Sequence, residues 1–385
     1  MEELKVKKGL SLTGEKQMIK RIGILTFHAS HNYGSMLQAY AMQTYLKKRG
    51  IEAENINLRT NIQKNMYAYP WNPTSIRSII KFLFYPKWMI ENIKKWNLFE
   101  KFLKQDLHIT SNEYHSWEEI EKDLSKLNYD AILCGGDQIW NLNCPDFDKS
   151  YLLPSELKGI NKIAYSPSPG GALNEFSNSQ KEIFKSYISK FNFISVRDAE
   201  ASSFMTDLLQ QHVPSVADPT LLLQASDYDK IIPQAPIIKG DYMLYYTPYY
   251  SEYSLKIAKQ LASQYKLKLI TTNGNIQSGK GLTKYQAVGP KEFLNILKYA
   301  KFVCGQSFHL IIFSIMYHKE FIAMDGNKDA RMKGFLKLCG LSERGIDLKK
   351  PQIGNYPAID YASVEKKLST FRQQSIQYID SFIEN

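Results

Sequence analysis

The chain has 385 residues, long enough for two or three domains, and its 44% hydrophobic and 23% charged content excludes wholesale disorder. Lys and Arg total 49 against 38 Asp and Glu, a net charge of +11, and 25 Tyr, 19 Phe and 5 Trp accompany them. This combination suits an anionic partner: nucleic acid, a membrane surface or a phosphorylated small molecule.

The spacing of the cysteines and the distribution of apolar residues exclude several further classes of protein. The four cysteines lie far apart with no CxxC pair, so we expect no disulfide framework, no structural zinc and no other metal site (Cys134, Cys144, Cys304 and Cys339). The first 20 residues lack the apolar core of a signal peptide, and no apolar run is long enough to span a membrane. We therefore predict a cytoplasmic protein, either soluble or peripheral at the inner face of the membrane.

An alternation of strands and helices begins after residues 1–20, which are polar and predict a flexible arm. Residues 21–27 (RIGILTF) form an apolar run that is typical of a buried parallel strand. Residues 36–50 have the spacing of a helix, and residues 51–58 resemble a second strand. This order predicts a βαβ unit.

Residues 60–106 interrupt the alternation with a basic, aromatic insert that we expect to be a loop followed by helices. Seven Lys or Arg and two Glu lie between Trp71 and Lys104, and eight aromatic residues are interleaved with them. Amphipathic basic segments of this kind can lie on anionic membranes. The alternative is that the aromatic residues form an internal helical core and the lysines are solvated.

The alternation resumes after the insert and restarts near residue 240. Strands are expected within residues 129–136, 161–166, 193–198, 241–248, 266–273, 301–306 and 320–325, with helices between them, and residues 215–223 predict a short strand plus a turn. Residues 224–240 are rich in Pro and charge and predict a boundary. We therefore predict an α/β protein with two Rossmann-like domains facing a cleft, at residues 21–228 and 229–350, followed by a helical tail at residues 351–385.

Loops that follow parallel strands are the candidate sites, because open α/β sheets bind ligands beyond the carboxyl ends of their strands. The first such loop places Asn32, Gly34 and Ser35 at the start of a helix, with Gln38 in its first turns. Free backbone N–H groups at that position bind anions or polar ligand atoms. The alternative is that Asn32 and Ser35 only cap the helix.

The loop after the strand at 129–136 combines glycine, polar side chains and an indole, which suits the hydroxyl groups and faces of a sugar ring. Its candidate residues are Gly136, Asp137, Gln138, Trp140 and Asn141. The alternative is a tight turn with Trp140 in the core.

Later loops carry cations and a histidine. Arg197 ends an apolar strand and can bind a carboxylate or phosphate, unless it pairs with a nearby acid. Ser307 and His309 open a helix whose dipole favours a neutral imidazole suited to proton transfer. Lys328 and Arg331 follow the next strand and can bind a phosphate. The alternative for His309 is a purely structural role, and the alternative for Lys328 and Arg331 is that they lie in a solvated basic loop.

In their order and spacing these segments resemble the polysaccharide pyruvyl transferase family over roughly residues 21–340. The most specific stretches are NYGSMLQAYA, GGDQIWN and SVRD, joined by IAYSPSPG, VADPTLLL and FVCGQSFHLIIFSIM. The resemblance implies a glycosyltransferase-B-like fold. It also implies transfer of the enolpyruvyl unit of phosphoenolpyruvate to a sugar, usually as a cyclic pyruvate ketal. Phosphoenolpyruvate is then a co-substrate, and no further cofactor is implied.

The resemblance also implies roles for individual residues. Arg197 and His309 match functional positions of the family, and Lys328 is the nearest match to a functional lysine. We expect Arg197, Lys328 and Arg331 to converge on the carboxylate and phosphate of phosphoenolpyruvate, and His309 to donate a proton to the substrate or to the departing phosphate.

One departure from the family pattern concerns the general base. Many members carry an acid after the first-loop glycine, where this chain has Ser35. A serine hydroxyl alone cannot act as a general base at neutral pH, so either Asp137 or His31 takes that role, or the base is a different residue in this branch of the family.

Partners and rival functions follow from the same resemblance. Surface polysaccharide precursors are commonly built on a polyprenyl diphosphate, so we expect a lipid-linked saccharide acceptor with the insert docked near it on the membrane. The alternatives are a glycosyltransferase that uses a nucleotide sugar and a non-catalytic protein that binds an anionic polymer. No nucleic-acid-binding module is recognisable, so nucleic acid is not expected as a partner. The acceptor sugar, the ketal stereochemistry and the oligomeric state stay open.

Overall fold

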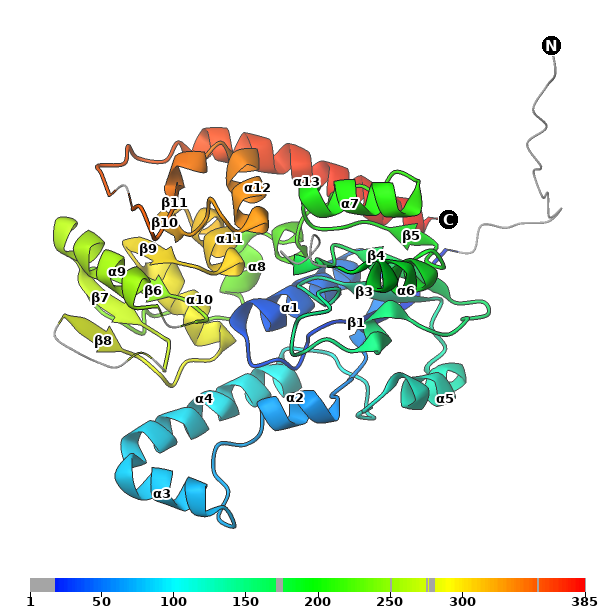
Figure 1. Cartoon of the computed structure of the whole chain (residues 1–385), viewed down its shortest axis with the longest axis horizontal. Helices are drawn as coiled ribbons and strands as arrows, with labels where there is room; N and C mark the ends of the chain where they lie inside the picture. The colour runs from blue at the N-terminus through cyan, green and yellow to red at the C-terminus, as the bar shows by residue number, and fades with distance from the viewer. Residues whose placement is uncertain are drawn as a thin grey trace.

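The computed structural model of the chain describes residues 18–170, 176–249, 251–274, 276, 281–351 and 353–384. Within them, two α/β units lie side by side, each built around a parallel sheet (Figure 1). Residues 1–17 of the predicted arm lie outside the described residues. Ile19 is already part of the fold, since its side chain is buried and its N–H donates to the Ile383 carbonyl at 3.1 Å.

The first unit has five parallel strands in the order β2-β1-β3-β4-β5. They are β1 (Arg21–Leu25), β2 (Glu52–Asn55), β3 (Ala131–Gly135), β4 (Asn161–Tyr165) and β5 (Phe193–Ile194). Its helices are α1 (Tyr33–Lys48), α5 (Trp117–Leu127), α6 (Asn178–Ile188), α7 (Ala199–Leu209) and α8 (Ala225–Asp229). Strands β1, β3 and β4 are almost wholly buried, because helices cover both faces of the sheet, and this explains why their sequences are largely apolar after the first one or two residues.

The second unit has six parallel strands in the order β11-β10-β9-β6-β7-β8. They are β6 (Tyr242–Tyr246), β7 (Lys268–Thr271), β8 (Leu282–Lys284), β9 (Phe302–Gly305), β10 (Glu320–Met324) and β11 (Gly345–Ile346). Its helices are α9 (Glu252–Gln264), α10 (Pro290–Tyr299), α11 (Phe308–Met316) and α12 (Ala330–Cys339). Two parallel sheets with flanking helices confirm the predicted α/β class with two Rossmann-like units in a glycosyltransferase-B-like arrangement.

Helix α1 lies between the two units and determines how they meet. Twelve of its 16 residues are buried, so it is apolar on most of its circumference. The Tyr33 ring stacks on Phe293 of α10 with ring centroids 4.2 Å apart, and its hydroxyl donates to the Val288 carbonyl at 3.2 Å. The amino end of α1 therefore lies against the second unit.

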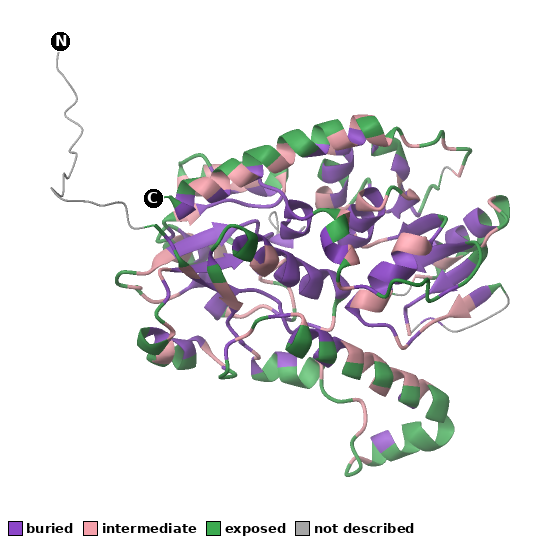
Figure 2. Ribbon diagram, turned by 180° about the vertical axis from the view of Figure 1, so that it is seen from behind, coloured by how far each residue is buried: buried purple, intermediate pink, exposed green. Residues whose placement is uncertain are grey.

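The insert forms a helical hairpin that projects from the first unit (Figure 1). Helix α2 (Asn61–Met66) is followed by α3 (Ile76–Phe84) and by α4 (Pro86–Gln105), which begins with a proline at its first position. Phe99 and Phe102 at the far end of α4 are buried in the core, whereas α3 is exposed almost throughout (Figure 2). Only one end of the insert therefore fits the expectation of an internal helical core.

Two chain segments refine their predicted structure. Of the short strand and turn expected at residues 215–223, the strand is reduced to a single bridge between Ser215 and Val196, and the turn is a 3₁₀ helix at Pro219–Leu222 that Asp218 caps. Residues 351–385 contain α13 (Tyr361–Ile383), which returns to the first unit, where Ser375 Oγ accepts from the Ala217 N–H at 2.8 Å. The domain limits at residues 228 and 350 stay predictions. None of the helices described is long and apolar enough to cross a membrane.

Candidate active site

A buried cluster of Arg197, Asp218 and His309 lies where the two units meet. Arg197 follows β5, Asp218 caps the 3₁₀ helix of the first unit, and His309 lies in the first turn of α11 in the second unit. One carboxylate oxygen, Asp218 Oδ2, is 3.1 Å from Arg197 Nη1 and 3.4 Å from His309 Nε2. The structure thus brings together the arginine and histidine singled out in the sequence, with an acid between them.

The electrostatics of this cluster leave part of the arginine available. Burial alone would raise the pKa of Asp218, but His309 and Arg197 outweigh it and hold that pKa below its ordinary value. Asp218 is therefore a carboxylate. Arg197 Nε and Nη2 are buried and have no hydrogen-bond partner among the described residues. Buried donors of this kind are normally satisfied, so this edge of the guanidinium is suited to a bound anion.

Gly34 allows His309 to lie directly against the start of α1. A Cβ atom added at Gly34 would be 2.1 Å from His309 Nδ1. This distance is too short for any side chain at position 34. The amino end of α1 is capped by Asn32, whose Oδ1 accepts from the Gly34 N–H at 2.9 Å, and that of α11 is capped by Ser307. The capping alternative is therefore confirmed for Asn32 but not for Ser35, whose hydroxyl bonds to Asp137, and two positive helix ends meet beside His309.

Ser35 and Asp137 are hydrogen-bonded to each other across the loops that follow β1 and β3. Ser35 Oγ donates to Asp137 Oδ2, and both side chains are buried. Gln38 Nε2 donates to Thr26 Oγ1 at 2.7 Å and to the Ser35 carbonyl at 2.9 Å. Gly136, with φ of 66°, approaches Gln38 so closely that an added Cβ would be 1.8 Å from Gln38 Oε1. This network holds a carboxylate beside the serine that replaces the acid of the family pattern.

His31, the other candidate base, is held away from Asp137 by its own partners. Its Nε2 lies 3.1 Å from Glu100 Oε1, and its ring stacks between Tyr67 and Phe99. Burial lowers the pKa of His31 below its ordinary value, although Glu100 opposes this. The geometry favours Asp137 as the residue adjacent to Ser35.

Trp140 does not line a cavity, which corrects its assignment as a substrate-binding residue. It is fully buried, its Nε1–H donates to the Tyr151 carbonyl at 3.0 Å, and Phe184 and Phe191 pack edge-on against its ring. The alternative of a core tryptophan is the one that the structure shows, because the indole has both its apolar neighbours and its hydrogen-bond acceptor inside the first unit.

Gln138 and Asn141 flank this tryptophan and form a polar pair. Asn141 Nδ2 donates to Gln138 Oε1 at 3.1 Å. Both side chains crowd Gly170 after β4, where an added Cβ would be 2.8 Å from Gln138 Oε1. The loops after β3 and β4 are therefore joined at this point.

Arg331 and Lys328 take different positions. Arg331 lines a cavity of about 500 Å³ together with Arg197, Asp218 and Phe308, and its guanidinium pairs with Asp329 at 2.5 Å. Lys328 pairs instead with Asp347 at 2.5 Å, is 44% exposed and is not among the residues that line this cavity. The expected convergence of Lys328 with the two arginines is therefore absent, because an acid of its own unit holds it outside.

Asp218 was not identified as a site residue from the sequence. The sequence feature that could have identified it is the position of Asp218 in VADPTLLL, one of the segments that carry the resemblance. An Asp-Pro pair is equally well explained by helix capping and turn formation, so this feature alone did not indicate a site. Only the fold shows that this acid faces both Arg197 and His309. Among the described residues, no group of three or more His, Cys, Asp or Glu side chains could hold a metal ion.

Comparison with known proteins identifies the family. The model of the family described as polysaccharide pyruvyl transferase matches residues 32–327, about three quarters of the chain. The chain belongs to this family. The match spans the first loop, Asp137, Arg197, Asp218 and His309. A comparison with curated protein sequences yields no match.

Solved structures of similar fold are distant in sequence. UDP-GlcNAc 2-epimerase from Neisseria meningitidis, bound to UDP-GlcNAc, is 10% identical, covers 95% of this chain and 94% of its own, and has a TM-score of 0.48. The E. coli heptosyltransferase WaaC with ADP is 11% identical, covers 94% and 99%, and has a TM-score of 0.40. The glycotransferase of kitacinnamycin is 12% identical, covers 93% and 95%, and has a TM-score of 0.48.

Proposed function

We propose that this protein transfers the pyruvyl unit of phosphoenolpyruvate to a saccharide and closes it as a ketal, in the biosynthesis of a surface polysaccharide such as a capsule or exopolysaccharide. Membership of the polysaccharide pyruvyl transferase family supports the reaction class. The observation that carries the proposal is the buried Arg197–Asp218–His309 cluster, whose guanidinium has two unpartnered nitrogens. A substrate with both a phosphate and a carboxylate fits this position.

The chemistry needs one proton donor, one proton acceptor and a site for the departing anion. A proton adds to C3 of the enol as a sugar hydroxyl bonds to C2, and the hydroxyl proton passes to a base. The C2–O bond to phosphate then breaks with its electron pair. A second hydroxyl bonds to C2 and closes the ketal, and its proton passes to the group that donated the proton to C3. His309 is the proposed donor, Asp137 the proposed acceptor, and Arg197 with Arg331 the proposed anion-binding residues.

Acceptor-dependent release of phosphate tests the proposal. The protein is incubated with phosphoenolpyruvate and a panel of saccharides, and phosphate is measured together with the mass gain of the product. We expect His309→Gln and Arg197→Met to lose turnover while the far-ultraviolet circular dichroism stays unchanged. No acceptor-dependent release across a broad panel would refute the function, and turnover at the wild-type rate in either variant would remove that residue from the mechanism.

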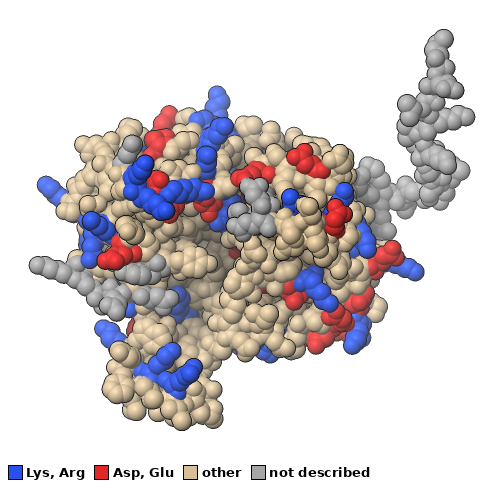
Figure 3. Space-filling view, viewed as in Figure 1, with Lys and Arg blue, Asp and Glu red and all other residues tan. Residues whose placement is uncertain are grey.

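We further propose that the acceptor is linked to a polyprenyl diphosphate and that the hairpin of α3 and α4 docks the protein on the inner face of the membrane. Helix α3 supports this: Ile76, Leu83 and Phe84 are 74%, 69% and 73% exposed. Arg77, Lys81 and Lys87 are exposed alongside them, and Figure 3 shows basic side chains on the projecting hairpin. Apolar side chains next to cations favour an anionic lipid surface.

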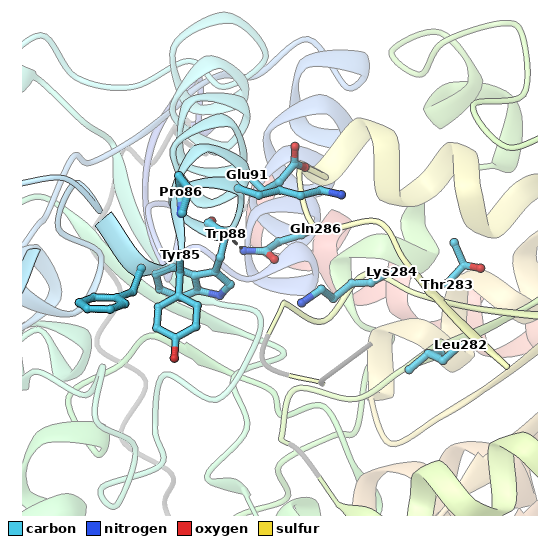
Figure 4. Close-up of a pocket in the computed structure, with 10 residues that line it drawn as sticks. Tyr85, Pro86, Trp88, Glu91, Leu282, Thr283, Lys284 and Gln286 are labelled. Atoms are coloured by element: carbon cyan, nitrogen blue, oxygen red, sulfur yellow. Dashed lines mark hydrogen bonds between the residues drawn. The ribbon is translucent and has the colours of Figure 1, made fainter. Parts of the chain in front are cut away.

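A cavity of about 590 Å³ lies between the hairpin and the second unit, directly beside α3. Figure 4 shows Tyr85 and Trp88 of the hairpin facing Lys284 and Gln286, and Gln286 Nε2 donates to the Trp88 carbonyl at 3.4 Å. Lys87 and Lys284 both line this cavity, so it can take a diphosphate that arrives from the membrane side.

Vesicle flotation tests the docking. We expect binding to vesicles of phosphatidylcholine with phosphatidylglycerol at low salt, and weaker binding at high salt. Replacing Leu83 and Phe84 by Ser removes two apolar side chains worth together roughly 3 kcal/mol or more, and should weaken binding roughly a hundredfold. Ile183→Ser, at an exposed position of α6 on the first unit, is the matched control. Equal binding by the double variant and the control would refute the docking.

A further inference from the structure

A second cavity opens between the two units on the side of the insert. Its volume is about 330 Å³, at the lower end of the range for small-molecule sites. It lies beyond the carboxyl ends of β1, β6 and β7, where open α/β sheets bind ligands, and the space-filling view is hollowed between the units (Figure 3). Residues of both units and of the insert line it, including Asn32, Asn92, Lys95, Trp96, Thr247 and Asn273.

Lys95 of α4 is the cation of this cavity, and it has no acidic partner among the described residues. Its ammonium lies over two aromatic rings, 5.3 Å from the centre of Tyr33 and 5.8 Å from that of Phe99. The nearby carboxylate of Glu100 is occupied, since Arg59 Nη2 lies 2.6 Å and His31 Nε2 lies 3.1 Å from its Oε1. In contrast, the adjacent Lys94 is exposed and pairs with Glu91 at 3.4 Å.

Lys95 is half-buried, and partial removal of an ammonium from water without an acidic partner costs free energy, for which ring contacts compensate only in part. An anion in the cavity would restore the missing interaction at low local dielectric, where it is strong. The cavity also holds the capping residue Asn32, so the amino end of α1 adds favourable potential. Amide side chains and Trp96 beside the lysine suit a polar organic ligand rather than a bare ion.

We propose that Lys95 is the phosphate-binding residue of this cavity, where its ammonium pairs with a phosphate carried by a substrate of the pyruvyl transfer. The inference rests on the proposed function only for the identity of that substrate. Two sources share this chemistry, namely phosphoenolpyruvate itself and a phosphoryl group on the saccharide acceptor. The Arg197 cluster already offers one anion site, so Lys95 provides a second cation from a different element.

The pH dependence of binding separates Lys95 from its neighbours. Burial lowers the pKa of Lys95 to about 8. Around it, burial lowers the pKa of His31 and raises those of Tyr33, Tyr67 and Tyr246, while His31 and Arg59 together overcome burial to lower the pKa of Glu100 to about 2. Of these groups only Lys95 changes charge between pH 7 and pH 9, and a phosphate monoester with its second pKa near ~6 is already dianionic there.

The experiment is isothermal titration of the full chain with phosphoenolpyruvate and, separately, with glucose 1-phosphate. At pH 7 we expect Lys95→Met to weaken binding of at least one probe by about tenfold to a hundredfold, and the matched Lys94→Met to leave both unchanged. Wild-type affinity for that probe should fall as pH rises from 7 to 9, because the ammonium is lost. Lys95→Arg should bind at pH 7 and show no such fall, because a guanidinium stays charged.

Each result decides the question. A loss confined to phosphoenolpyruvate assigns the phosphate to the co-substrate, and a loss for glucose 1-phosphate assigns it to the acceptor. Wild-type affinity of Lys95→Met for both probes, or failure of the wild type to bind either, overturns the proposal. Because binding is measured without turnover, Lys95-dependent binding with no acceptor-dependent phosphate release would contradict the proposed function alone.

Discussion

Replacing Gly34 by alanine should disable His309 while leaving the fold largely intact. The new Cβ would lie 2.1 Å from His309 Nδ1, whereas ordinary contact begins at 3.4 Å, so the two must separate by more than 1 Å. His309 Nε2 is only 3.4 Å from Asp218 Oδ2, and a shift of that size removes this interaction. Displacement of a reacting group by about 1 Å costs roughly a hundredfold in rate. We therefore expect a loss of turnover of about that size.

Stability should respond far less than activity. Overpacking costs about 1–3 kcal/mol, and alanine regains up to about 1 kcal/mol as a better helix former, so the net loss is between about zero and 3 kcal/mol. Phosphate release and urea unfolding measure the two quantities. Gly354→Ala, whose added Cβ meets nothing within 4 Å, is the control and should change neither. Wild-type turnover in Gly34→Ala would refute the argument that the Gly34–His309 contact positions the imidazole.

Two further predictions concern buried acids. Asp218→Asn leaves the Arg197 guanidinium buried without its carboxylate, so urea unfolding should show that the free energy of unfolding falls by about 3–5 kcal/mol. The control Asp241→Asn, at an exposed carboxylate, should lower it by less than ~0.5 kcal/mol. A loss for Asp218→Asn as small as the control's would contradict the pairing. Burial raises the pKa of Glu100, but His31 and Arg59 lower it to about 2 overall. Its stabilising contribution is therefore present above pH 4.5 and is lost as pH falls toward 2. Glu100→Gln should flatten the pH dependence of unfolding in that window. Glu91→Gln, at a half-buried position of α4 where the carboxylate pairs with the exposed Lys94, should not. Parallel profiles for Glu100→Gln and the wild type would exclude the effect.

Local chemistry made the strands and most helices predictable. Buried parallel strands such as β1 and β3 are apolar along most of their length, and Asn32 marks the start of the helix that it caps. The turn around Asp218 was expected but the extent of the strand before it was not, because a short apolar stretch near Asp-Pro suits a strand and a 3₁₀ turn equally well. Trp140 was misassigned for a similar reason, since an indole beside polar residues suits a sugar or a core.

Motif order determined the family and nominated Arg197, His309 and the first loop, because those residues lie at the ends of recognisable strands and helices. Which groups meet was decided by the tertiary structure alone. Asp218 joins Arg197 to His309, Asp137 supports Ser35, and Lys328 turns to Asp347 because contacts between segments far apart in the chain depend on how the two sheets pack. Lys95 is a further example: in the sequence it is one of many lysines, and only the packing of the second unit against α4 half-buries it with no acidic partner among the described residues.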